Sequence, residues 1–197
     1  MPAATLLELA GADLTPAKIA DAALILIDMQ NEYRAGPVAV TGFEPAVAAA
    51  ANLLAAARKS GSPVFHIAQK GRAGGLFDRA AERGQITAEL TPQPGEPVIE
   101  KPLPNAFAGT ELAALVAETG RKNLIVVGFM THMCVSSTTR AALDLGYRVT
   151  IDAGACATRD LPDGRGGVIA AGVLHDIALA ELADRFAIVA RESGALL

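Results

Sequence analysis

The run Asn123-Leu124-Ile125-Val126-Val127-Gly128, with Cys134 shortly after it, decides the fold of this chain. The run is apolar, rich in β-branched residues and bounded by polar or glycine residues, which is typical of a buried parallel strand. Helix-compatible residues follow from Val135 to Gly146. Cys134 therefore lies where a strand ends and a helix begins, at the carboxyl edge of an α/β sheet, where open sheets place their active sites.

This position gives Cys134 a chemical interpretation. The N-terminus of a helix carries partial positive charge and unpaired N–H groups. We therefore expect a thiol with a lowered pKa, beside a place that can hold an oxyanion. The alternative is packing, because most free cysteines act as small buried hydrophobes. A partner for Cys134 at the end of another strand would favour the chemical interpretation.

Strand-like and helix-like segments alternate along the rest of the chain, with short connections between most of them. This pattern predicts a single α/β domain over residues 1–197. Its core is expected to be a doubly wound, mostly parallel six-stranded sheet with helices on both faces and the Rossmann-like strand order 3-2-1-4-5-6. The expected strands are 22–27, 63–68, 97–100, 123–128, 147–151 and 186–189, and the expected helices are 45–59, 110–119, 135–146 and 167–185.

Composition excludes several classes of partner. The chain has 197 residues and a formal net charge of −4, which gives no electrostatic case for nucleic acid. No apolar run approaches the roughly 20 residues of a membrane span. With two cysteines and no basic N-terminal leader, the chain is expected to be cytoplasmic. Its mean hydropathy of +0.34 and its alanine-rich helices favour a homo-oligomer, a homodimer or larger.

Three of the expected strands end in residues that carry chemistry, namely Asp28, Lys101 and Cys134. Parallel strands bring their carboxyl ends to one edge, so these residues can converge. Taken singly, Asp28 could cap a turn and Lys101 could be a solvated surface lysine. Together they offer a base, a cation and a thiol, because a buried carboxylate can deprotonate a thiol while an ammonium stabilises both anions.

The sequence around these residues contains, in this order, the segments Leu26–Tyr33, Lys101 with Asn105–Thr110, Gly128–Val135 and Asp152–Thr158. Together these segments resemble the isochorismatase-like cysteine hydrolase superfamily. The resemblance implies a catalytic triad of Asp28, Lys101 and Cys134, and a cis peptide between Phe129 and Met130. It also implies that the backbone N–H groups of Met130 and Cys134 form an oxyanion hole.

The resemblance also narrows the expected activity. It implies a metal-independent hydrolase that cleaves the C–N bond of a small-molecule amide or carbamoyl compound through a thioester. Nicotinamidases of the family carry an Asp-x-His metal motif where this chain has Gln69-Lys70-Gly71-Arg72, so neither metal nor cofactor is expected. Two alternatives stay open. One is an isochorismatase-type vinyl-ether hydrolase, although these commonly have glycine where Cys134 stands. The other is a non-catalytic binding or assembly protein with the same fold.

Residues near the predicted site could bind the substrate. The candidates for the pocket are Tyr33, His66, Gln69, Phe107 and Phe129.

The long irregular segment 69–93, rich in glycine and charge, is expected to set substrate choice. Four cations of this segment are candidates to meet an anionic group on the substrate, namely Lys70, Arg72, Arg79 and Arg83. The alternatives for this segment are a solvated basic face and a subunit contact.

Three other residues have more ordinary expected roles. His132 is expected to position the loop before Cys134, and His175 is expected to be structural or to lie at an interface. Cys156 is expected to pack in a loop of small residues.

Overall fold

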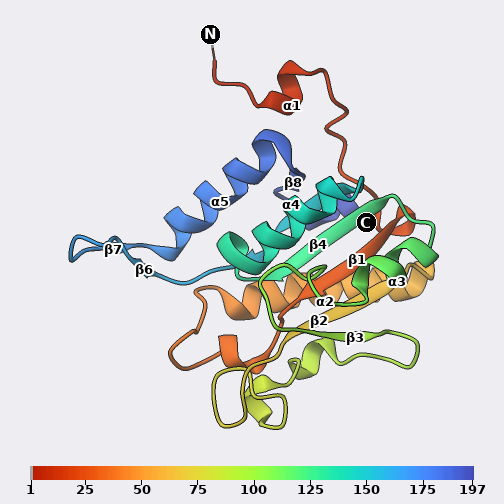
Figure 1. Cartoon of the computed structure of the whole chain (residues 1–197). Coiled ribbons are helices and arrows are strands. Elements are labelled where there is room, and N and C mark those ends of the chain that lie inside the picture. Colours follow the sequence, from red (N-terminus) through yellow and green to blue (C-terminus); the bar gives the residue numbers. More distant parts are fainter. Residues whose placement is uncertain (1) are drawn as a thin grey trace.

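Six strands form one parallel sheet in the order β3-β2-β1-β4-β5-β8 within residues 2–197, which the computed structural model describes (Figure 1). The predicted α/β class and strand order are confirmed, because β8 is the sixth strand of this sheet. Two further strands, β6 (Leu161–Pro162) and β7 (Val168–Ile169), form a separate antiparallel pair. The sheet strands are β1 (Ala22–Ile27), β2 (Val64–Gln69), β3 (Val98–Lys101), β4 (Asn123–Phe129), β5 (Arg148–Ala157) and β8 (Ile188–Ala190).

Helices cover both faces of the sheet (Figure 1). One face packs on α2 (Phe43–Ser60), and the other packs on α3 (Leu112–Glu118), α4 (Ser136–Asp144) and α5 (Ala171–Arg185). The short α1 (Leu6–Leu9) lies against α5. None of the helices within residues 2–197 is both long and apolar enough to cross a membrane. The single-turn helices are Ile19–Asp21, Asn31–Tyr33, Glu82–Gly84, Ala88–Leu90, Thr131–Val135 and Ser193–Leu196.

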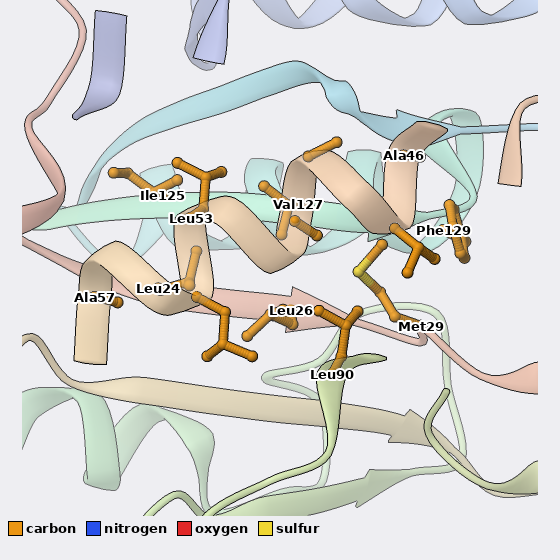
Figure 2. Packing of buried hydrophobic residues seen from close by; sticks show 14 of the residues in the cluster. Leu24, Leu26, Met29, Ala46, Leu53, Ala57, Leu90, Ile125, Val127 and Phe129 are labelled. Atoms are coloured by element: carbon orange, nitrogen blue, oxygen red, sulfur yellow. The ribbon is translucent and has the colours of Figure 1, made fainter. Parts of the chain in front are cut away.

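The continuous apolar run of β1 is explained by burial on both faces. Leu24 and Leu26 pack with Leu53 of α2, as Figure 2 shows. Ile25 and Ile27 belong to the cluster on the opposite face, beneath α3, α4 and α5. Side chains alternate along a strand, so a central strand covered by helices on both sides has to be apolar throughout. This burial fixes β1 at the centre of the sheet.

Two expectations about local structure are wrong. The helix expected from residue 167 begins at Ala171, because β6 and β7 take up the residues before it. Cys156 lies in β5 and not in a loop. The pairing of β4 with β5 shifts register between Val126 and Gly128, so β5 accommodates extra residues and continues to Ala157.

Gly128 brings β4 very close to β1. A Cβ atom built on Gly128 would lie 2.0 Å from the carbonyl oxygen of Ile27, and its φ of +123° belongs to a region that side chains rarely adopt. Ile27 directly precedes Asp28, and Gly128 pairs with Ile27 in the sheet. The bare backbone at this position therefore lets the ends of β1 and β4 approach each other.

Candidate active site

Asp28, Lys101 and Cys134 meet at the carboxyl edge of the sheet. Asp28 directly follows β1, Lys101 is the last residue of β3, and Cys134 lies in the single helical turn after β4. The Lys101 Nζ lies 2.7 Å from Asp28 Oδ2 and 3.3 Å from Cys134 Sγ. Asp28 and Lys101 are fully buried, and Cys134 is 3% exposed. Since β2 separates β1 from β3, the long lysine side chain is what allows the ammonium to reach both groups.

Gln69 completes the surroundings of the Lys101 ammonium. The ammonium donates a hydrogen bond of 2.6 Å to Gln69 Oε1, in addition to its contacts with Asp28 and Cys134. The side-chain nitrogen of Gln69 donates to the carbonyl of Pro102 at 3.2 Å, which fixes the direction of the amide. The structure therefore gives Gln69, expected only as a pocket residue, a second role as a partner of the buried lysine.

Burial decides the proton affinities in this cluster. It raises the pKa of Asp28, and the Lys101 ammonium opposes that effect. Burial is the main cause that raises the pKa of Cys134 to about 12, and the negative charge of Asp28 is the second. The Lys101 ammonium opposes this rise as well. The lowered thiol pKa expected from the strand-to-helix position is therefore wrong. At neutral pH the thiol keeps its proton, and a nucleophilic attack needs a base beside it.

This electrostatic arrangement predicts the effect of removing one charge. In Asp28→Asn the carboxylate that disfavours the thiolate is gone while Lys101 remains, so the pKa of Cys134 should fall. The pH midpoint of Cys134 alkylation by iodoacetamide should move to lower pH, measured by mass spectrometry of the modified peptide. Cys156 serves as the internal control, because its pKa is also raised to about 12 by burial. A midpoint that moves upward would contradict the assigned effect of Asp28.

A cavity of about 270 Å³ opens onto Cys134. None of the side chains that line it carries a charge. Asp28 and Lys101 are not among them, so a molecule in the cavity meets the thiol and not the buried ion pair. The lining residues are Tyr33, Val38, Gln69, Phe77, Pro104, Met130, Met133 and Cys134.

Three of the five expected pocket residues do not line this cavity. His66 is buried within β2, where its Nε2 lies 3.0 Å from Glu96 Oε2, and burial lowers its pKa. Phe107 stacks on Tyr147 with ring centroids 6.4 Å apart. Phe129 is fully buried in the core beneath α2.

Tyr33 and Gln69 do line the cavity, and Phe77 is the main residue that sequence reasoning missed. Phe77 is the only aromatic residue in segment 69–93, and this feature of the sequence could have marked it as a pocket residue.

The cations of segment 69–93 are directed elsewhere. Lys70 and Arg79 both pair with Glu100, at 2.8 and 3.2 Å. Neither Arg72 nor Arg79 lines the cavity. The expected contact between these arginines and an anionic substrate group is therefore not supported, because the segment contributes Gln69 and Phe77 to the cavity wall and no charge.

The backbone beside Cys134 has an unusual geometry. The peptide bond between Phe129 and Met130 is cis. The Met130 carbonyl accepts hydrogen bonds from the N–H groups of Met133 and Val135. Met130 also lines the cavity. An oxyanion hole built from Met130 and Cys134 stays a prediction.

The other two histidines support the same turn. His132 Nδ1 lies 2.6 Å from Thr158 Oγ1, and His175 Nδ1 lies 2.9 Å from Thr131 Oγ1. Both histidines therefore anchor the turn that carries Cys134.

Over residues 2–197 there is no group of three or more His, Cys, Asp or Glu side chains arranged to hold a metal ion.

The sequence profile of the isochorismatase domain matches residues 22–192, which include the whole cluster. The chain belongs to the isochorismatase family. The crystal structure of an isochorismatase from Pseudomonas putida KT2440 shares this fold with a TM-score of 0.95 and 46% identity, over 100% of both chains. The fold and the family predicted from the sequence are thus confirmed.

Curated members of the isochorismatase family are also similar to this chain. A secreted isochorismatase effector from Verticillium dahliae is 35% identical over 89% of this chain and 90% of its own length. A ureidoacrylate amidohydrolase from Enterobacter is 30% identical over 64% of this chain and 70% of its own length. We therefore describe the protein as an isochorismatase-family hydrolase.

Proposed function

We propose that this isochorismatase-family protein is a metal-independent cysteine hydrolase that cleaves the C–N bond of a small amide or carbamoyl compound. One observation carries the proposal. A buried ammonium contacts both a carboxylate and a thiol, at 2.7 and 3.3 Å, and only the thiol borders the cavity. This arrangement provides a nucleophile at the point of substrate entry and a base held behind it.

The reaction follows from these positions. Asp28 accepts the thiol proton as the Cys134 Sγ attacks the carbonyl carbon of the substrate. The carbonyl oxygen becomes an oxyanion, and the N–H groups of Met130 and Cys134 would donate to it. The C–N bond then breaks, the proton on Asp28 passes to the departing amine, and the acyl group stays on sulfur as a thioester. Water adds to the thioester with Asp28 again as base, which releases the acid and the thiol.

The raised pKa of Asp28 suits this role, because a stronger base removes the proton of a weakly acidic thiol more easily. Lys101 contacts both groups, so its ammonium can offset the negative charge on the carboxylate or on the sulfur. The vinyl-ether alternative would give the thiol no role, because that reaction does not need a nucleophilic sulfur. A binding protein would gain nothing from a buried ion pair that is expensive to desolvate.

The cavity indicates the class of substrate. Its lining side chains are apolar apart from Tyr33, Gln69 and the thiol, and a volume of about 270 Å³ is small for a ligand site. We infer a compact substrate with an uncharged, apolar group next to the carbonyl. The amidohydrolase among the relatives supports C–N chemistry on this scaffold. A cytoplasmic location and a homo-oligomer stay predictions, and one relative is named a secreted effector.

A substrate screen tests the proposal. Primary amides, N-substituted amides and carbamoyl compounds with apolar groups are incubated with the protein, and release of ammonia or amine is measured. Acid-quenched samples are then examined by intact mass for an acyl group on Cys134. Hydrolysis accompanied by this adduct is the expected result. Hydrolysis that proceeds equally well in Cys134→Ala, with no adduct, would refute a cysteine mechanism.

A further inference from the structure

Phe77 forms a wall of the cavity beside Cys134, and the structure holds this ring in place from several sides. Its ring lies 5.1 Å from that of Tyr33, a second wall, at an angle of 52°. We propose that Phe77 determines which substrates reach Cys134 by limiting the size of the apolar group admitted, and that Glu32 is the residue that positions it. The inference rests on the proposed function only in taking Cys134 as the group that a substrate must reach.

Glu32 is buried in an unusual way for a carboxylate. It is 1% exposed, and its Oε2 accepts a hydrogen bond of 3.0 Å from the backbone N–H of Phe77. Its other oxygen lies 3.5 Å from Arg83, a half-exposed side chain. A buried side-chain oxygen is costly unless it finds a hydrogen-bond partner, and the N–H of Phe77 is that partner for Glu32 Oε2. The contact therefore ties the backbone of Phe77 to the segment that follows β1.

Phe77 needs that restraint because of its backbone. Its φ of 58° lies in the left-handed region, which is unfavourable for a bulky residue. The Glu32 carboxylate holds the N–H of Phe77, and the N–H of Gly71 donates to its carbonyl at 2.9 Å. Gly71 can approach this closely because it has no side chain. A Cβ there would lie 1.8 Å from the carbonyl oxygen of Leu76.

The loop that carries Phe77 is also tied to the segment that follows the catalytic strand β1. The Gln30 side chain donates to the carbonyl of Gly84 at 2.7 Å, and the Asn31 side chain donates to the carbonyl of Glu82 at 3.0 Å. Both residues lie within four positions of Asp28. The same short segment therefore carries Asp28 and holds the cavity wall in place. In this proposal the loop selects substrates as a fixed wall and does not act as a mobile lid.

The test measures access to Cys134 directly. Rates of covalent labelling are compared for α-chloroketones that carry a methyl, a phenyl or a naphthyl group, by mass spectrometry at Cys134. Phe77→Ala and Phe77→Gly should both raise the naphthyl-to-methyl rate ratio by about tenfold or more, since even one excluded methylene is worth about that much. The glycine variant relieves the left-handed backbone, so agreement between the two assigns the effect to the ring.

Leu76→Ala is the matched control, because Leu76 precedes Phe77 in the same loop, is 40% exposed and does not line the cavity. Its rate ratio should equal that of the parent.

Glu32→Ala should raise the ratio as Phe77→Ala does, whereas Glu32→Gln should restore it, since an amide oxygen can still accept from the Phe77 N–H. An unchanged ratio in both Phe77 variants would overturn the role of Phe77. Equal ratios in Glu32→Ala and Glu32→Gln would overturn the role of Glu32. Labelling does not require amide turnover, so this result stands or falls separately from the substrate screen.

Discussion

Cys134→Ala should abolish hydrolysis and all covalent labelling at this position while the fold is retained. Removing the nucleophile of an acyl-enzyme mechanism lowers kcat by a factor on the order of 10⁶. The Cys134 sulfur borders an existing cavity, so its loss should cost only about 1 kcal/mol of the free energy of unfolding. Activity is measured on whichever amide the screen identifies, and folding is measured by circular dichroism and urea denaturation.

The second cysteine provides the control for this variant. Cys156 is buried in β5 and does not line the cavity at Cys134. Cys156→Ala should therefore keep full turnover and full labelling of Cys134. Substantial activity in Cys134→Ala would show that Cys134 is not the nucleophile. Loss of activity in Cys156→Ala with the fold intact would do the same.

Lys101→Met should have the largest effect on stability. It leaves Asp28 fully buried without its ion-pair partner, and breaking such a pair costs about 3–5 kcal/mol. The double variant Asp28→Asn/Lys101→Met removes both charges and should recover much of this loss. Urea denaturation of the parent, the two single variants and the double variant gives the coupling between the residues. Additive effects of the two substitutions would show that the ion pair does not act as a unit.

The same variant should respond to pH in a defined direction. Without Lys101, burial raises the pKa of Asp28 with no cation to oppose it. A carboxyl whose pKa is higher in the folded state favours folding when protonated, and this contribution is lost as the pH rises through the folded pKa. Lys101→Met should thus be closest to the parent in stability at acidic pH and furthest from it at alkaline pH. The opposite trend would mean that burial does not raise the folded-state pKa of Asp28 in the variant.

Much of the architecture was predictable because it depends on local patterns. The apolar run of β1 and the strand before Cys134 each predicted a central strand, and helix packing on both faces bears this out. The convergence of Asp28, Lys101 and Cys134 followed from parallel topology, since residues at the carboxyl ends of neighbouring strands share one edge.

The parts that were missed depend on contacts between distant residues. The residue type of His66 does not reveal that Glu96 occupies its ring nitrogen. Similarly, the bond between Phe77 and Glu32 joins residues 45 positions apart, and no local pattern encodes it. The raised pKa of Cys134 was missed because the helix terminus was considered without the degree of burial.

The bare backbone at Gly128 has a consequence for how this protein can evolve. Any side chain there would have to push β4 away from the Ile27 carbonyl, and that carbonyl belongs to the residue before Asp28. The six-stranded sheet could absorb a small separation, because its other strands and both helical layers would remain packed. Asp28 and Cys134, in the roles proposed for them, could not absorb it, since a proton passes between two side chains only at hydrogen-bond range. A lineage that drifted away from glycine at this position would therefore keep a folded protein and lose the proposed chemistry first.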